Sequence, residues 1–412
     1  MHSNRKILYL SYDGMTDPLG QSQVIPYLEG LSSKGFKYTL ISFEKDANYK
    51  SRKEYISYIL ANSGIDWIPI SYTKRPPVIS TLWDLIKLNR TCKQILRNNN
   101  FNIIHCRSYI TSIIGSSLSK TYGLKFIFDM RGFWADERVD GGLWNLKNPM
   151  YDLIFKYFKR KERKFLTAAD AVVCLTTQAK EIINGWSLVP NVKRLQVIPC
   201  SADFNNFSLQ TPDSKSKSRK FLSISPDTLV VSYLGSLGTW YLLKEMLQFF
   251  LLLKERYSNS VFLFITPEKK SYIMETALSA GLMKEDLRIL FAERKEVPFL
   301  MSASDINIFF IKPAFSKKGS SPTKLGEVLA MGIPVICNNI GDVSEVVEST
   351  QGGVAIDDFT EQSFVKALNE IPRLFNIDHA LIREKAFQYY DLNKAIDAYE
   401  KVYHLVLEED GA

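Results

Sequence analysis

Residues 320–330 read SSPTKLGEVLA and are followed at 331–336 by MGIPVI. The apolar run at 306–311 that precedes them is typical of a buried strand. Ser321 and Pro322 then form the usual opening of a helix, because a serine can cap the free amides and a proline at the first helical position loses no hydrogen bond. The Gly-Ile-Pro of the second run ends the helix and begins another apolar segment. The stretch therefore predicts a strand, a loop, a helix and a second strand.

The predicted helix has one apolar and one polar edge. Its apolar residues recur at helical spacing and should face the core: Leu325, Val328 and Leu329. The opposite edge carries Thr323, Lys324 and Glu327. Free N–H groups at the helix start, together with the lysine, form an anion site. Glu327 lies one turn deeper and is placed to accept hydrogen bonds from a neutral diol. A phosphate beside a diol suggests a nucleotide diphosphate with its ribose.

This stretch resembles the donor-site motif of family-4 glycosyltransferases of the GT-B fold, which is usually written E-x7-E. Glu327 matches the second Glu, so the resemblance implies that it holds the donor ribose while amides at the helix start hold the diphosphate. The first Glu would fall on Gly319 and is absent. The Ser-Pro-Thr-Lys variant with a single Glu also recurs in bacterial members of the family. The alternative is a plain helix cap with a surface lysine and an exposed glutamate.

The composition indicates a globular protein with excess positive charge. The 412 residues suffice for two domains, and 46% of them are hydrophobic and 23% charged. The formal charge of +8 favours anionic partners such as phosphates or anionic lipid surfaces. The five cysteines form no C-x-x-C pair, which argues for a reducing compartment and against zinc. Neither a signal peptide nor a membrane span is apparent, so we expect a cytoplasmic protein.

Several functional classes are disfavoured by missing motifs. The chain has no strand-associated G-x-G-x-x-G and no P-loop pattern, which argues against dinucleotide oxidoreductases and P-loop NTPases. It also lacks the spacing of nucleic-acid-binding modules, so no nucleic-acid partner is expected.

Strands and helices alternate along the chain, as in α/β proteins. The first half has predicted strands at 6–11, 38–43, 65–70, 102–106, 125–129 and 171–175, and predicted helices at 21–34, 55–62, 80–97, 109–120 and 150–167. A second series of strands is predicted at 229–234, 261–265, 289–291, 306–311 and 334–336. The sequence thus predicts an α/β fold with two Rossmann-like domains whose sheets are mostly parallel and bind ligands at the carboxyl ends of their strands. The resemblance adds that GT-B domains face each other across a cleft.

The domain boundaries follow from changes in composition and from the resemblance. We predict an N-terminal acceptor-binding domain at 1–205 and a C-terminal nucleotide-sugar-binding domain at 229–390. The stretch 206–228 between them contains the polar, basic run SKSKSRK and is predicted to be a linker. The segment 391–412 ends in a helical pattern; in GT-B enzymes such a helix returns to the N-terminal domain, and an ordinary last helix is the alternative.

Two strand ends of the first domain offer candidate residues. The turn-rich loop at 13–23 contains Gly20, which would let the backbone approach a ligand. In GT-B enzymes the equivalent loop reaches the donor phosphate and the acceptor, whereas a simple turn is the alternative. His105 matches the position at which family-4 enzymes place a histidine near the donor sugar, and is therefore a candidate catalytic residue with Lys324 and Glu327. A buried core histidine is the alternative.

The loop at 128–138 resembles the R-x-x-W loop of polysaccharide-assembling family members. Asp136 or Glu137 could hydrogen-bond sugar hydroxyls, Trp134 could stack on a sugar face, and Arg131 could meet a phosphate. We assign these four residues to acceptor binding. The alternative is an internal network of salt bridges.

The loop at 234–241 follows the first strand of the second domain. Family-4 enzymes usually carry an arginine and a lysine here that neutralise the diphosphate. This chain has Ser236 in place of the arginine, so either Lys244 or Lys324 would supply the positive charge. The predicted donor-binding residues are Gly20, Gly235, Ser236, Lys244, Ser321, Thr323, Lys324 and Glu327.

Three further segments have weaker assignments. In the family, the loop at 293–298 lies near the donor base. Two basic and aromatic segments, 74–97 with Trp83 and 151–161, could dock on anionic lipid, and the alternative is a solvated charged face.

Together these features predict a glycosyltransferase that moves a sugar from a UDP or GDP sugar to a hydroxyl of a glycan or lipid-linked acceptor in cell-surface polysaccharide synthesis. The resemblance to family 4 implies that the reaction retains the anomeric configuration. Lys324 and the helix amides would stabilise the departing diphosphate. No metal cofactor is expected, because no Asp-x-Asp occurs. The alternatives are an enzyme similar to nucleotide-sugar 2-epimerases and a non-catalytic nucleotide-sugar-binding or scaffold protein.

Overall fold

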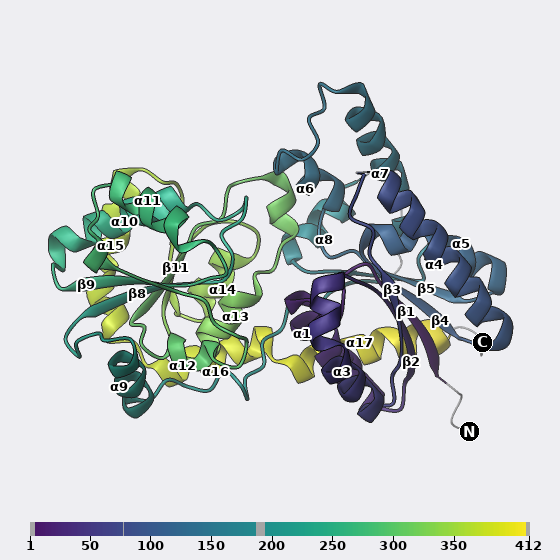
Figure 1. Ribbon diagram of the computed structural model, residues 1–412, viewed down its shortest axis with the longest axis horizontal. Coiled ribbons are helices and arrows are strands. Elements are labelled where there is room, and N and C mark those ends of the chain that lie inside the picture. The colour runs from purple at the N-terminus through teal and green to yellow at the C-terminus, as the bar shows by residue number, and fades with distance from the viewer. Residues whose placement is uncertain (1–4, 77, 187–193, 409–412) are drawn as a thin grey trace. The chain divides into compact units, whose positions relative to one another are not determined.

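Two parallel sheets, each covered by helices, form the computed structural model, which describes residues 5–76, 78–186 and 194–408 (Figure 1). The chain divides into two units. Unit 1 comprises Met1–Pro199, Lys318–Ser320 and Leu392–Ala412, and unit 2 comprises Cys200–Lys317 and Ser321–Asp391. The predicted α/β fold with two Rossmann-like halves is confirmed.

Unit 1 has a seven-stranded sheet in the order β3-β2-β1-β4-β5-β6-β7, and every pairing in it is parallel. Its strands are Lys6–Ser11 (β1), Lys37–Glu44 (β2), Asp66–Ser71 (β3), Ile103–Arg107 (β4), Lys125–Asp129 (β5), Ala171–Cys174 (β6) and Leu195–Val197 (β7). Its helices are Pro18–Gln23 (α1), Ile25–Ser33 (α2), Asp46–Asn62 (α3), Ile79–Asn98 (α4), Ser108–Tyr122 (α5), Trp134–Asp140 (α6), Pro149–Ala168 (α7), Thr177–Asn184 (α8) and Leu392–Leu407 (α17). The strand order reverses beside β1, where ligand sites of such sheets usually form.

Unit 2 has a six-stranded parallel sheet in the order β10-β9-β8-β11-β12-β13. Its strands are Leu229–Leu234 (β8), Ser260–Ile265 (β9), Leu287–Leu290 (β10), Ile306–Phe309 (β11), Val335–Asn338 (β12) and Gly353–Ile356 (β13). Its helices are Pro212–Phe221 (α9), Leu243–Arg256 (α10), Lys270–Ser279 (α11), Val297–Met301 (α12), Thr323–Ala330 (α13), Val343–Ser349 (α14), Glu361–Phe375 (α15) and His379–Tyr390 (α16). Short 3-10 helices occupy Lys284–Asp286 and Phe315–Gly319.

The last helix, α17, packs against α2 in unit 1. The approach is close because Gly30 in α2 has no side chain: a Cβ there would lie 2.2 Å from Cδ1 of Ile396. Tyr399 and Tyr403 of α17 are buried in the same core as Tyr9 of β1. The C-terminal helix is therefore part of the core of unit 1.

Several elements differ from the predicted ones. The predicted helix at 21–34 is split at Val24, because Pro26 lacks the N–H that a continuous helix would need. The predicted linker at 206–228 contains α9, which begins with a capping box between Thr211 and Ser214. It belongs to unit 2, and Arg219 in it is buried against Asp305 at 2.6 Å. The basic composition of this run concealed its helical character.

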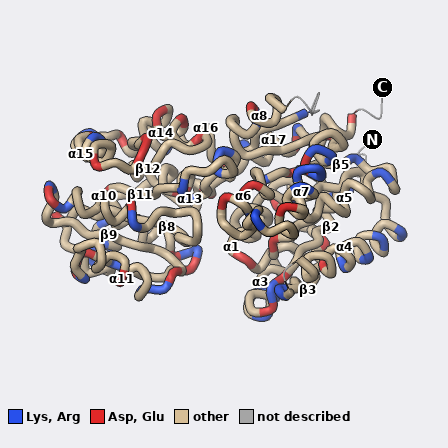
Figure 2. The backbone as a smooth tube through the Cα atoms, turned by 90° about the horizontal axis from the view of Figure 1, so that it is seen from above, with Lys and Arg blue, Asp and Glu red and all other residues tan. Residues whose placement is uncertain are grey.

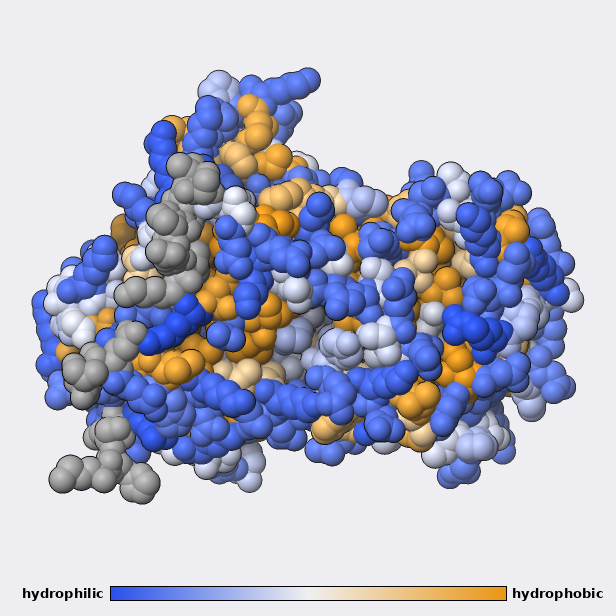
Figure 3. Space-filling model, turned by 180° about the vertical axis from the view of Figure 1, so that it is seen from behind, coloured by the Kyte–Doolittle hydropathy of each residue, from blue (hydrophilic) through white to orange (hydrophobic). Residues whose placement is uncertain are grey.

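Helices α4 and α7 of unit 1 each present hydrophobic side chains to solvent. Figure 2 shows lysines and arginines along both helices. Figure 3 shows hydrophobic side chains exposed on the part of unit 1 that projects from its surface, where the chain runs from α6 into α7. No helix in the described part of the chain is both long and apolar enough to cross a membrane.

Candidate functional site

Helix α13 begins with amides that no side chain caps. Pro322 occupies the N-cap position and forms no side-chain cap, and the first hydrogen bond into the helix runs from the Leu325 amide to the Pro322 carbonyl at 3.0 Å. The prediction that Ser321 caps this helix is wrong, because its hydroxyl accepts a hydrogen bond from the Cys200 amide at 3.2 Å. The amides of Thr323 and Lys324 precede the first helical hydrogen bond and remain suited to an anion.

The Lys324 amine lies among aromatic rings beside the loop after β8. Nζ donates a hydrogen bond to the Tyr233 hydroxyl at 3.0 Å and lies 3.5 Å from the centroid of the Tyr241 ring. Gly235, at φ +100°, leaves room for it, since a Cβ there would lie 3.4 Å from Nζ. No carboxylate forms an ion pair with Lys324 in the described residues. Burial lowers the pKa of Lys324 well below its usual value, and the charge of Glu327 opposes that effect only in part.

The loop between β8 and α10 is fixed by its backbone. The Tyr233 hydroxyl donates to the Ser236 carbonyl at 2.8 Å, and the Gly235 amide donates to the Ile265 carbonyl at 2.9 Å. The Ser236 side chain is exposed, as is Lys244 in the first turn of α10. Of the two lysines considered for the diphosphate, Lys324 is the one held against this loop.

Glu327 is buried one turn into α13. Only 4% of it is exposed, and Oε1 lies 2.5 Å from Nη1 of Arg294. The Arg294 guanidinium in turn stacks 4.8 Å from the centroid of the Phe207 ring. The alternative of a surface glutamate at this position is therefore contradicted. Gly326 lets α13 pack on α16, because a Cβ there would lie 2.8 Å from the Tyr390 ring.

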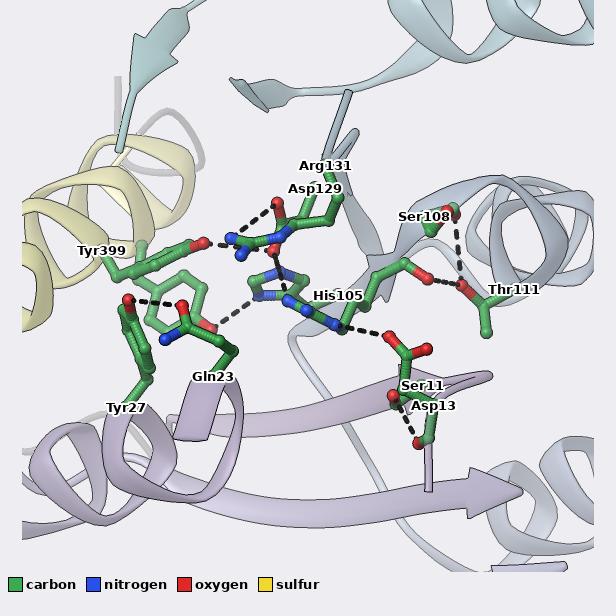
Figure 4. A network of polar contacts seen from close by, with 12 residues as sticks. Ser11, Asp13, Gln23, Tyr27, His105, Ser108, Thr111, Asp129, Arg131 and Tyr399 are labelled. Carbon is green, nitrogen blue, oxygen red and sulfur yellow. Dashed lines mark hydrogen bonds and ion pairs between the residues drawn. The ribbon is translucent and has the colours of Figure 1, made fainter. Parts of the chain in front are cut away.

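Unit 1 contains a second charged cluster at the carboxyl ends of β1, β4 and β5 (Figure 4). Its centre is Asp129, which is 1% exposed and accepts a hydrogen bond from the Tyr399 hydroxyl at 3.1 Å. Arg131 and Arg107 lie 3.9 Å and 4.0 Å from its carboxylate, and Arg107 also donates to Asp13 at 3.0 Å. Burial opposes ionisation of Asp129, but the two arginines and His105 outweigh it and lower its pKa.

His105 lies inside this core and not at an open strand end. It is 1% exposed, and its Nδ1 is 2.8 Å from the Tyr403 hydroxyl of α17. Nε2 lies 3.7 Å from Asp129. Burial lowers the pKa of His105, which keeps the ring neutral. This arrangement favours the alternative of a satisfied core histidine over direct contact with a sugar.

The predicted acceptor residues fall into two groups. Asp136 in α6 pairs with Lys159 at 2.8 Å, and Lys159 also pairs with the buried Glu162 at 2.5 Å, which is the internal network named as the alternative. Trp134 is packed among Tyr109, Trp144 and Phe158, so it belongs to an aromatic cluster.

Arg131 also takes part in an internal ion-pair network, through Asp129 at 3.9 Å, whereas Glu137 lies in α6. Arg131 has φ +55°, an uncommon backbone conformation for a residue with a side chain, directly after β5. Glu137 is half-buried in α6. Both therefore stay candidates for acceptor binding.

Gly20 lies near the loop that follows β1, and the shape of that loop explains why a glycine is needed there. A Cβ there would lie 2.2 Å from the Gly14 carbonyl, so the glycine permits the loop to fold on itself. The loop is also held by the buried Glu44 of β2, which accepts hydrogen bonds from the amides of Met15 at 2.7 Å and Thr16 at 3.1 Å. These contacts give the loop after β1 a fixed shape and favour the alternative of a structural turn for Gly20.

Sequence reasoning overlooked the residues that hold the candidate groups in place. Tyr233, Tyr241 and Arg294 organise the site of unit 2, and Asp129 and Arg107 form that of unit 1. Each lies at or just after the carboxyl end of a strand, apart from Tyr241, and that position is the signal that was available.

Comparisons with known proteins identify the family and the fold. Two family models match the chain: Glycosyltransferase Family 4 over residues 23–206 and Glycosyl transferases group 1 over residues 214–385. No curated protein matches it.

Solved structures share the fold along nearly the whole chain. A glycosyltransferase from Rickettsia africae has a TM-score of 0.73 and 15% identity to this chain, and the match covers 98% of this chain and 100% of the Rickettsia chain. WaaG, a glycosyltransferase involved in lipopolysaccharide biosynthesis, has a TM-score of 0.69 and 14% identity, covering 97% and 99%. Anabaena Alr3699/HepE in complex with UDP-glucose has a TM-score of 0.66 and 15% identity, covering 96% and 98%.

Proposed function

This chain is a family-4-like glycosyltransferase of the GT-B fold, and we propose that it transfers a sugar from a UDP or GDP sugar to a hydroxyl of a glycan or lipid-linked acceptor, with retention of anomeric configuration. The observation that carries this proposal is that Lys324 and Glu327 lie one turn apart on α13. Lys324 lies beside uncapped amides and forms no ion pair with a carboxylate in the described residues, and Glu327 is a buried carboxylate one turn deeper. These are the groups that a diphosphate and a ribose need.

The reaction needs negative charge to be stabilised on the departing diphosphate. Lys324 and the first amides of α13 would contact that charge as the bond to the sugar breaks. Glu327 would accept hydrogen bonds from the ribose hydroxyls, with Arg294 orienting its carboxylate. The phosphate oxygen that leaves would take the proton of the acceptor hydroxyl, so this scheme uses no protein base. No metal is part of it.

The acceptor and the cellular role rest on weaker support. Arg131 and Glu137 are the proposed acceptor-binding residues. The complex of Alr3699/HepE with UDP-glucose supports UDP as the first donor to test, and the role of WaaG in lipopolysaccharide biosynthesis supports a cell-surface glycan as the product. We place the reaction in the cytoplasm, at the inner face of the membrane.

The proposal is tested by incubating the protein with UDP and GDP sugars, with and without octyl glycosides as simple acceptors. We expect release of the nucleoside diphosphate that depends on the acceptor, and a new glycoside whose anomeric configuration, read by NMR, equals that of the donor. Conversion of the nucleotide sugar without an acceptor would instead identify an epimerase. Binding of the nucleotide without any turnover of the whole sugar panel would contradict the proposal and favour a scaffold protein.

A further inference from the structure

The outer face of α4 changes from apolar to basic along its length. In its first half Ile79, Leu82, Trp83 and Ile86 are between 43% and 63% exposed, at the spacing of one helix face. Its second half continues with the exposed residues Arg90, Lys93 and Arg97. Soluble proteins seldom leave so many large apolar side chains together in water.

Helix α7 repeats this pattern. Met150, Leu153 and Tyr157 in its first half are between 42% and 66% exposed, and Leu143 and Leu146 in the preceding segment are exposed as well. Arg160, Arg163 and Lys164 follow in its second half, again exposed. Helices α4 and α7, which are separated in the sequence, thus both have an exposed apolar first half and an exposed basic second half.

Negative charge is sparse on both outer faces. Asp84, the acidic residue of α4, is fully buried. In α7, Glu162 is buried and Asp152 pairs with Lys156 at 2.7 Å. The exposed charge of both faces is therefore mainly positive, with Asp152 as a partly exposed acid that is paired to Lys156.

The topology brings the two apolar halves to the same end of unit 1. Helix α5 contacts both α4 and α7, so the three helices form one layer on the sheet. Each follows a strand of one parallel sheet, β3, β4 or β5, and therefore starts at the carboxyl edge of that sheet. The apolar halves lie at that edge and the basic halves extend away from it, as the blue segments in Figure 2 illustrate.

We propose that this outer face of α4 and α7, which we call the α4–α7 surface, docks on an anionic lipid bilayer. The apolar first halves and the segment before α7 enter the interface, while the arginines and lysines of the second halves meet the lipid phosphates. The bilayer is favoured over a protein partner because the surface combines large apolar residues with a clear excess of positive charge. The proposal extends the proposed function, because docking by this edge brings the strand ends of unit 1 close to a lipid-linked acceptor.

Vesicle flotation tests the α4–α7 surface with the full chain and no nucleotide sugar. We expect binding to vesicles of phosphatidylcholine mixed with phosphatidylglycerol, and little binding to phosphatidylcholine alone. Trp83→Ser with Leu153→Ser should reduce binding about tenfold or more, because two large apolar groups leave the interface. Arg90→Glu with Arg160→Glu should also reduce binding to the mixed vesicles about tenfold or more, because the cations that meet the lipid phosphates are replaced by groups with the same charge as those phosphates.

The matched control is Tyr55→Ser with Tyr58→Ser, since these two tyrosines of α3 are 63% and 67% exposed in the same unit but outside the α4–α7 surface. It should bind vesicles like the unaltered protein. Release of nucleoside diphosphate with octyl glycosides should be unchanged in every variant, so failure of the enzyme assay and failure of docking are separate results. Equal binding by all variants would overturn the proposal. Absence of vesicle binding, combined with self-association that the Trp83 and Leu153 variant abolishes, would assign the surface to a second copy of this chain.

Discussion

The charged cluster of unit 2 and that of unit 1 differ in how their cations are neutralised. Lys324 lies against the rings of Tyr233 and Tyr241, and among the described residues no carboxylate pairs with it. In unit 1, by contrast, Arg107 and Arg131 share the buried Asp129. Both clusters stand at the carboxyl ends of parallel strands, yet only the first lacks a countercharge.

This difference favours a binding site in unit 2 and a structural network in unit 1. A buried cation without a partner is costly in the free protein, and an incoming anion removes that cost. A cation that is already paired gains less from an anion, and its partner is needed for the fold. We therefore expect Lys324 to bind an anion and Asp129 to stabilise the core.

The largest effect is expected from Asp129→Asn. It would leave Arg107 and Arg131 without their shared charge in a buried place, and loss of one partner from such a pair costs about 3–5 kcal/mol. Native-state hydrogen exchange should show faster opening of β4 and β5, while β8 in unit 2 stays protected. The control is Asp213→Asn, whose ion pair with Lys217 is exposed and contributes about 1 kcal/mol or less. Equal effects of the two variants would contradict the structural role of Asp129.

The next effect concerns Glu327→Gln. Its neutral amide would lose the ion pair with Arg294 and accept weaker hydrogen bonds from ribose hydroxyls. UDP affinity should fall about tenfold or more, as expected for a charged hydrogen-bond acceptor. Inorganic pyrophosphate, which has no ribose, should bind with unchanged affinity. Titration calorimetry with UDP and with pyrophosphate measures the two affinities. An equal loss of affinity for pyrophosphate would show that Glu327 acts on the diphosphate instead of the ribose.

A smaller effect is expected from Tyr233→Phe. This change removes the hydroxyl that accepts from Lys324 and donates to the Ser236 carbonyl. Affinity for UDP and for pyrophosphate should fall about fivefold, the size of one neutral hydrogen bond. Tyr241→Phe keeps the ring beside Lys324 and is the matched control. If the control loses as much affinity as Tyr233→Phe, the hydroxyl of Tyr233 has no special part in holding Lys324.

The smallest effect is the uptake of up to one proton when UDP binds. Burial lowers the pKa of Lys324 in the free protein, and the negative diphosphate should raise it again. Between these two pKa values the complex holds more protons than the free protein, so the affinity should fall as the pH rises. Calorimetry in buffers with different ionisation enthalpies measures this uptake. The same uptake in Lys324→Met would assign the proton to another group.

The fold was readable from the sequence because local signals and hydrophobic patterns agreed. Every strand predicted between 6 and 336 is present, with bounds that differ by a few residues. The short β7 and β13 were missed, since three or four residues carry little pattern. Helix α9 was also missed, because its apolar contacts come from other segments and its own sequence is almost entirely polar.

The site was only partly readable, because burial depends on distant segments. The local helix pattern placed Lys324 and Glu327 in the first turns of one helix, as the structure has them, while their role in donor binding stays a prediction. Sequence reasoning could not show that Tyr399 and Tyr403, nearly 300 residues away, enclose His105. It also could not show that Asp136 forms an ion pair with Lys159. Such contacts decide whether a polar side chain is free for a ligand.

The central claim is that the donor diphosphate binds at the start of α13, and titration calorimetry of UDP and GDP against two matched variants tests it most directly. Lys324→Met should weaken the preferred nucleotide about tenfold or more, because a charged hydrogen-bond donor is lost. Lys244→Met, which alters an exposed lysine of the same unit, should bind it like the unaltered protein. Unchanged binding by Lys324→Met, or loss of binding by Lys244→Met, would contradict the claim.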